Sequence, residues 1–143
     1  MFNDACQKNR DAIYGIRSYT QISKTQQAGG LGSGFAIAPG IIATVGHLAH
    51  IDNDPSRIHT NFEVIRSPDI GQQMEVARLI AIDPNHDIAL LKIDNPRSNQ
   101  FLTLENKRMP TGTSCGSLGF PLGELIQPGP NQIQINLVER LIV

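Results

Sequence analysis

The segment GSGFAIAPGIIATVGHLAH, residues 32–50, decides the fold, because two short apolar runs in it meet at a Pro39-Gly40 turn. Both runs are rich in β-branched or small apolar residues and are bounded by glycine, which is typical of β-strands joined by a tight turn. The second run ends at His47, so an imidazole stands where a buried strand reaches the surface. Such a histidine, taken alone, is more often a hydrogen-bonded core residue than a functional group.

Short runs of the same kind recur along the chain, with turn residues between them and no long helical pattern. Six of them fall between residues 12 and 93: AIYGIRSYTQI, SGFAIAP, GIIATVGHL, NFEVIRS, MEVARLIAI and DIALLKI. Gly29-Gly30 and Pro39-Gly40 are expected to separate the first three runs, and SPDIG at 67–71 is suited to a hairpin turn. The pattern predicts an all-β protein, a closed or sandwiched antiparallel β-barrel.

We expect four parts along the chain. Residues 1–12 form an N-terminal segment that favours a short helix, and residues 13–94 form the β-barrel. Residues 95–113 carry two prolines and little periodicity, which indicates a connector. Residues 114–143 contain SCGSLGF and NQIQINLVERLIV, enough for two strands but not for a closed barrel. Because two such strands expose their edges, we expect this part to pack on the barrel, a second copy or another chain.

Composition and charge narrow the class of protein. The 143 residues are 40% hydrophobic, which suits one domain with its own core. Twelve Lys and Arg stand against 13 Asp and Glu, for a net charge of -1, and the signs are mixed, so neither nucleic acid nor an anionic membrane is expected as a partner. Without a secretory signal pattern or an 18-residue apolar run, a cytoplasmic location is expected. Cys6 and Cys115 fit no metal or redox spacing, and no disulfide is expected.

A second candidate group is Asp87, in the segment NHDIALLKID. Its carboxylate stands at the entrance of an apolar run, where an ionised group needs hydrogen-bond donors or a charged partner. Taken alone, it is explained equally well as an aspartate that caps a turn. His47 and Asp87 are 40 residues apart (87 minus 47), which leaves room for two intervening strands.

Together these motifs resemble the trypsin-like (chymotrypsin-fold) serine peptidases, and the HtrA-type branch in particular. GSGFAIAPGIIATVGHL is similar to that family's glycine-flanked strand followed by Thr-x-x-His, here Thr44 to His47. HDIALLKI resembles the segment that carries the family's catalytic aspartate. SLGFPLG, at 117–123, resembles the strand that opens the family's second barrel. The chain departs from the family at Val45, usually a small residue or Asn, and at Gly46, usually Ala.

The resemblance implies a double-barrel fold, of which this chain holds the first barrel and the start of the second. It implies hydrolysis of peptide bonds through an acyl-serine intermediate, with His47 as general base and Asp87 as its orienting partner. The substrate would be a peptide or an unfolded protein, and neither a metal nor an organic cofactor is implied. The Asp87 carboxylate should then lie roughly 2.6–3.2 Å from the His47 ring.

The family's nucleophile stands in a Gly-x-Ser-Gly-Gly segment, and the 143 residues contain none. The resemblance therefore places the serine beyond Val143, and we expect the chain alone to be inactive. Ser33, in LGSGF, precedes His47 and is predicted to be structural. Cys115, in TSCGSLGF, is a rival nucleophile, but it follows Asp87 by only 28 residues (115 minus 87) and is predicted to be a small buried thiol.

Two other interpretations stay open. A zinc site built from His47, His50 and His86 would need supporting ligands or cysteines that the sequence pattern does not offer. A protein of a different class, a catalytically inactive protease-like module that binds peptides or acts as a scaffold, would retain the same barrel. A Gly-x-Ser-Gly-Gly segment in the reading frame after Val143 would favour the enzyme, and a stop codon there would favour this binding module.

Overall fold

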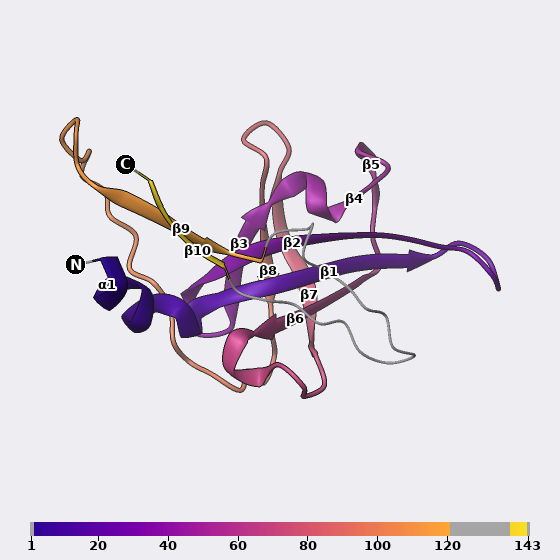
Figure 1. The fold of residues 1–143 in the computed structure, drawn as a ribbon. Helices are drawn as coiled ribbons and strands as arrows, with labels where there is room; N and C mark the ends of the chain where they lie inside the picture. The colour runs from indigo at the N-terminus through magenta and orange to yellow at the C-terminus, as the bar shows by residue number, and fades with distance from the viewer. Residues whose placement is uncertain (1, 121–137, 143) are drawn as a thin grey trace.

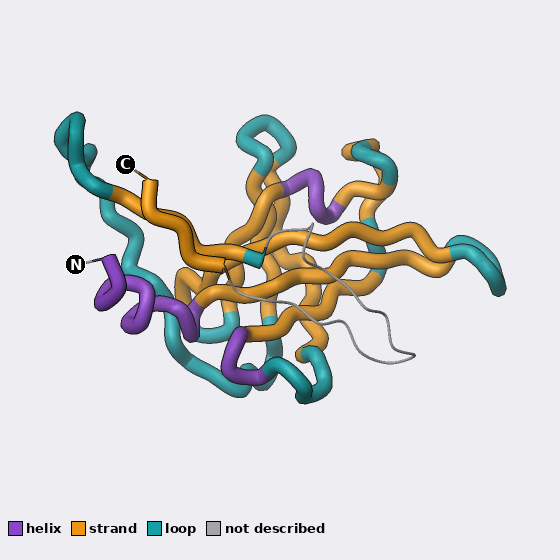
Figure 2. The backbone as a smooth tube through the Cα atoms, in the orientation of Figure 1, coloured by secondary structure: helices purple, strands orange, loops and turns teal. Residues whose placement is uncertain are grey.

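The computed structural model describes residues 2–120 and 138–142. Six strands close into an antiparallel barrel in the order β1-β2-β3-β8-β7-β6 (Figure 1, Figure 2). They are β1 (Ile13–Gln21), β2 (Gln27–Ala38), β3 (Ile41–Val45), β6 (Asn61–Arg66), β7 (Glu75–Asp83) and β8 (Ile88–Lys92). The expected all-β barrel is confirmed, and each of the six apolar runs contributes one strand.

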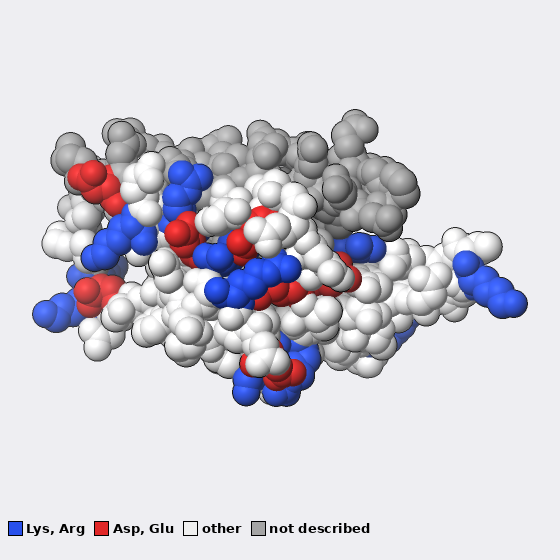
Figure 3. Space-filling model, turned by 90° about the horizontal axis from the view of Figure 1, so that it is seen from below, with Lys and Arg blue, Asp and Glu red and all other residues white. Residues whose placement is uncertain are grey.

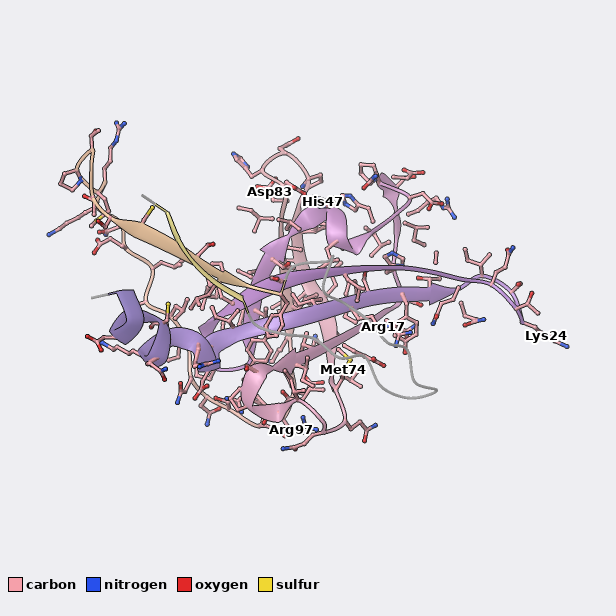
Figure 4. The ribbon with its side chains drawn as sticks, viewed as in Figure 1. Arg17, Lys24, His47, Met74, Asp83 and Arg97 are labelled. Atoms are coloured by element: carbon pink, nitrogen blue, oxygen red, sulfur yellow. The ribbon has the colours of Figure 1, made fainter. Side chains whose placement is uncertain are left out.

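The first hairpin is longer than the sequence pattern suggests. β1 and β2 pair from Ile13↔Phe35 to Gln21↔Gln27, and the far end of this hairpin, near Lys24, projects beyond the barrel (Figure 4). The expected break at Gly29-Gly30 is wrong, because both glycines lie within β2. Packing is tight at Gly29, where a Cβ would lie 3.0 Å from the carbonyl oxygen of Ser18, whereas a Cβ on Gly30 would make ordinary contacts at 3.4 and 3.6 Å.

The barrel interior is filled by side chains from most of its strands. Those with no exposed surface include Tyr14, Ile16, Ala36, Ile42, Val64 and Leu91. Burying one aliphatic side chain of this size contributes about 1.5–3 kcal/mol. The closed barrel is therefore the cooperative unit on which any site at its end depends.

The sequence pattern did not predict a small sheet outside the barrel, formed by β4 (His50–Ile51) and β5 (Asp54–Ile58). Asp52 and Asn53 connect its strands with φ angles of 52° and 59°, a left-handed region that Asp and Asn enter more readily than other non-glycine residues. This turn folds the chain back on the segment that follows His47.

The helix α1 (Phe2–Asn9) confirms the expected N-terminal helix, and it lies on the same side of the molecule as the C-terminus (Figure 1). β9 (Cys115–Gly119) confirms the expected strand in SCGSLGF, and it pairs antiparallel with β10 (Val138–Ile142). Five residues of the segment NQIQINLVERLIV form β10, and its other residues lie outside the described part of the chain. Pairing with another chain stays a prediction.

Charges are mixed on the face of the molecule shown in Figure 3, where blue and red side chains alternate without a large area of one sign. Among the helices that the structure describes, none combines the length and the apolar character needed to cross a bilayer.

Candidate active site

His47 lies on one turn of 3₁₀-helix, η2 (Gly46–Ala49), which follows β3 directly. In Figure 4 it is found at the same end of the barrel as Asp83, the last residue of β7. The pairing of β3 with β8 extends one residue past the end of β3, because the N–H of Gly46 donates to the backbone carbonyl of Asp87 at 2.8 Å. The histidine thus stands at the end of a strand, as its sequence context predicts, and the turn of helix that carries it follows directly.

Asp87 lies in the loop between β7 and β8, immediately before β8. Its φ is 55°, a left-handed conformation that costs a non-glycine residue about 1–3 kcal/mol unless its surroundings hold it. Two contacts from η2 hold it: the Gly46 N–H donates to its carbonyl, and the His47 N–H donates to its Oδ1 at 2.7 Å. This backbone conformation turns the carboxylate toward the histidine.

The structure brings the two predicted residues together. His47 Nδ1 lies 2.8 Å from Asp87 Oδ2, inside the expected range. Hydrogen bonds from the His47 ring, and then from the His47 backbone N–H, hold the pKa of Asp87 below its ordinary value of 3.8. A carboxylate that is ionised can only accept, so Nδ1 carries the ring proton and Nε2 of the neutral ring keeps a free lone pair. This is the tautomer that a general base requires.

Gly46 permits the close approach of the two segments. A Cβ at this position would lie 3.2 Å from Asp87 Oδ1, from the Asp87 carbonyl carbon and from Ile88 N. Such contacts are tighter than ordinary packing, so a larger residue would require the Asp87 loop to shift by a few tenths of an ångström. The family usually has alanine at this position. In this chain the residue is glycine, and the Asp87 loop packs directly on its backbone.

A cavity of about 550 Å³ lies beside the pair. Its walls include residues 28–33 of β2, His47 and Leu48 of η2, the β4–β5 turn, and Phe120. The side chains of His47 and Asp87 are 59% and 49% exposed, so water reaches both. A ligand bound in this cavity would contact the His47 ring, and the described residues alone leave the pair open to solvent.

Two further histidines form another wall of this cavity; sequence reasoning considered His50 only as a possible zinc ligand and assigned no role to His59. His50 and His59 are buried and line it, and burial lowers the pKa of His59 below its ordinary value of 6.5. His59 Nδ1 lies 3.0 Å from the hydroxyl of Thr20, so β1 holds the ring in place. The turn residues Asp52 and Asn53 were the signal that could have placed these two histidines side by side.

Ser33 links two parts of the chain that are far apart in sequence. Its hydroxyl accepts a hydrogen bond from the Phe120 N–H at 2.7 Å and donates one to the Phe120 carbonyl at 3.2 Å. Phe120 is buried in a second apolar cluster with Ile13 and Ile65. This agrees with the structural role predicted for Ser33, which fastens the end of β9 to β2.

The alternative candidates are not assembled into a site. Cys115 is exposed and free at the start of β9, so the prediction of a buried thiol is wrong; the two-stranded sheet that carries it leaves its first residues in solvent. His86 bonds Asp83 Oδ2 through Nδ1 at 2.7 Å. Within residues 2–120 and 138–142, no three His, Cys, Asp or Glu side chains are grouped so that they could hold a metal ion, so the zinc interpretation gains no support there.

Comparison with known proteins gives a family and a fold. Residues 32–141 match the family model described as "Trypsin-like peptidase domain". Among solved structures, the active form of the Rv3671c protease from M. tuberculosis is similar at a TM-score of 0.71 and 20% identity, over 97% of this chain and 50% of that one. The serine endoprotease from Yersinia pestis is similar at 0.66 and 20% identity, over 99% and 44%. No curated protein sequence matches. The chain thus spans about half the length of the solved structures it resembles.

Proposed function

The chain belongs to the trypsin-like peptidase family, and from this membership and the His47–Asp87 geometry we propose that it carries the base half of a serine endopeptidase site. The observation that carries the proposal is the 2.8 Å contact between His47 Nδ1 and Asp87 Oδ2 beside a cavity that the His47 ring helps to line. The glycine-flanked segment before His47 is the reason to place the chain in the HtrA-type branch.

In the proposed reaction, Nε2 of His47 removes the proton from a serine hydroxyl as its oxygen bonds to the carbonyl carbon of the scissile peptide. The imidazolium then gives this proton to the leaving amine, and the acyl-serine that remains is hydrolysed by water with the same base. Asp87 keeps the ring in the correct tautomer and stabilises its charged form. The mechanism uses no metal and no organic cofactor.

The nucleophile is proposed to lie in sequence beyond Val143, in the Gly-x-Ser-Gly-Gly segment that these 143 residues lack. We propose that residues 13–94 are the first barrel, 95–113 the connector, and 114–143 the start of a second barrel that supplies the serine and the oxyanion hole. The exposure of His47 and Asp87 supports this division, because a second barrel over the cavity would exclude water and strengthen the electrostatic stabilisation there. The substrate is a peptide or an unfolded protein, and β9–β10 is the proposed edge for pairing with another chain.

The test compares the chain with a longer protein that includes the sequence following Val143 in its reading frame. We expect the longer protein to cleave an unfolded protein substrate and to react with a fluorophosphonate serine probe, and we expect the 143-residue chain to do neither. His47→Ala should abolish cleavage by the longer protein without unfolding it. A stop codon after Val143, or labelling of a serine within the 143 residues, would contradict the proposal; the stop codon would favour the inactive binding module.

A further inference from the structure

The turn that carries His47 has almost no stability of its own. η2 is a single 3₁₀ turn of four residues with no side-chain cap at its N-terminus. A turn this short makes too few internal hydrogen bonds to fix its own backbone. The accuracy with which His47 is placed must therefore come from contacts with other elements.

The last three carbonyls of this turn, those of His47, Leu48 and Ala49, each have a partner. The His47 carbonyl accepts from the N–H of His50, and the Ala49 carbonyl accepts from the N–H of His59 at 2.8 Å. The Leu48 carbonyl is bound by a side chain instead, because the hydroxyl of Ser18 donates to it at 2.7 Å. Ser18 belongs to β1, 30 residues earlier in the chain, and has no exposed surface.

The side chain of Leu48 is seated on β2 at the same place. A Cβ on Gly32 would lie 3.1 Å from Leu48 Cδ2, and one on Gly30 would lie 3.6 Å from Leu48 Cδ1. Leu48 is 7% exposed, and its side chain occupies the space that a Cβ on Gly32 would need, whereas the distance at Gly30 is that of an ordinary contact. Two contacts with the barrel therefore hold Leu48, the residue next to His47: one through its carbonyl and one through its side chain.

We propose that Ser18 is a positioning residue for the His47–Asp87 pair, acting through the Leu48 carbonyl. This inference rests on the proposed function, in which His47 is the base. Without the Ser18 hydroxyl, the Leu48 carbonyl is left buried and unpaired, and η2 can satisfy it only by moving. Such a move changes two of the three hydrogen bonds that the turn makes with Asp87, namely the His47 N–H to Oδ1 and the ring Nδ1 to Oδ2.

The experiment follows Asp87 in the 143-residue chain by carbon-13 NMR of its carboxyl group as the pH is lowered. His47→Ala sets the scale, because it removes the hydrogen bond of the ring. We expect Ser18→Ala to move the titration midpoint of Asp87 upward by about a third or more of the shift seen in His47→Ala, and to speed hydrogen exchange of the His47 amide about tenfold.

A matched pair separates the hydroxyl from packing. Ser18→Thr keeps the donor and Ser18→Val has the same shape without it, so the midpoint should stay near the wild-type value in the first and rise in the second. Ser33→Ala removes another serine hydroxyl of the barrel, one that bonds Phe120, and should leave the midpoint where it is. If Ser18→Thr and Ser18→Val both prevent folding, the Asp87 midpoints of Ser18→Ala and Ser33→Ala are compared: a rise in the first alone supports the positioning role, and no difference overturns it.

The outcomes distinguish the two claims. If His47→Ala raises the midpoint and Ser18→Ala lowers only the thermal stability, Ser18 is a structural residue and the positioning role is overturned while the proposed function stands. If His47→Ala itself leaves the midpoint unchanged, the His47–Asp87 pair does not form in solution, and the proposed function fails with it.

Discussion

Among the residues that the structure describes, two histidine–carboxylate pairs have nearly the same distance between ring nitrogen and carboxylate oxygen. His47 Nδ1 is 2.8 Å from Asp87 Oδ2, and His86 Nδ1 is 2.7 Å from Asp83 Oδ2. The second pair is formed within one loop, three residues apart, and its histidine side chain is 75% exposed. Asp83 also accepts from the backbone N–H groups of Asn85 and His86, as an aspartate that caps a turn does.

The His47–Asp87 pair differs in how it is built. Its members come from two elements that are 40 residues apart, and three hydrogen bonds join them: the ring contact, the His47 N–H to Oδ1 and the Gly46 N–H to the Asp87 carbonyl. His47 lines the cavity, whereas His86 is not among the residues of its wall. The comparison teaches that a short distance does not define a site; what distinguishes the first pair is that three hydrogen bonds join two segments far apart in the chain and that His47 lines a cavity.

The largest expected difference between the pairs is catalytic. In a longer protein that carries the proposed nucleophile, Asp87→Asn should lower kcat by about four orders of magnitude, because the amide allows the wrong ring tautomer. Asn also tolerates the left-handed backbone at this position, so the fold should persist.

Asp83→Asn is the matched control and should change kcat by no more than about twofold. Steady-state hydrolysis of a peptide substrate measures both variants. Equal losses in the two would mean that the distinction drawn between the pairs is wrong.

A smaller effect is expected from crowding the contact between η2 and the Asp87 loop. Gly46→Ala places a Cβ 3.2 Å from Asp87 Oδ1 and from backbone atoms, and should lower the free energy of unfolding by about 1–3 kcal/mol. Gly30→Ala, whose Cβ meets its neighbours at 3.4 and 3.6 Å, should cost clearly less. Urea unfolding of the three proteins tests this, and a larger loss at Gly30 would refute the close approach described for Gly46.

The smallest effect concerns stability at acid pH. Because the pKa of Asp87 is lowered in the folded chain, its contribution to stability is present above the ordinary value of 3.8 and is lost as the pH falls through the lower, folded value. The contribution is modest, since both side chains are about half exposed.

His47→Ala removes the main cause of this shift, so the variant should lose less stability than wild type on acidification. The free energy of unfolding, measured across the acid range for both proteins, gives the difference. An identical pH dependence would show that the pair contributes nothing to the folded state.

The sequence predicted the barrel because its signal is local. Alternating apolar runs and the Pro39-Gly40 turn define strands without knowledge of their partners. It predicted His47 and Asp87 only because the two motifs resemble those of one family; either residue alone has an ordinary structural explanation. Their contact could be expected from that resemblance, but the left-handed φ of Asp87 could not.

What the sequence could not give are features set by contacts between distant strands. The Gly29-Gly30 pair looks like a turn, yet both residues lie within β2, where a Cβ on Gly29 would lie 3.0 Å from the carbonyl oxygen of Ser18 in β1. Ser18 has no local signature, because its partner is a carbonyl 30 residues away. Cys115 was predicted to be buried because small thiols usually are, whereas within the described residues its strand pairs with a single partner, β10, and leaves it exposed.

Nitrogen-15 NMR of the His47 ring tests the central claim most directly, since it reports which ring nitrogen carries the proton. We predict that the neutral ring is protonated at Nδ1, with Nε2 unprotonated, and that Asp87→Asn alters this state while Asp83→Asn leaves it unchanged. A ring protonated mainly at Nε2, or one whose state does not respond to Asp87→Asn, would contradict the assignment of His47 as a base oriented by Asp87.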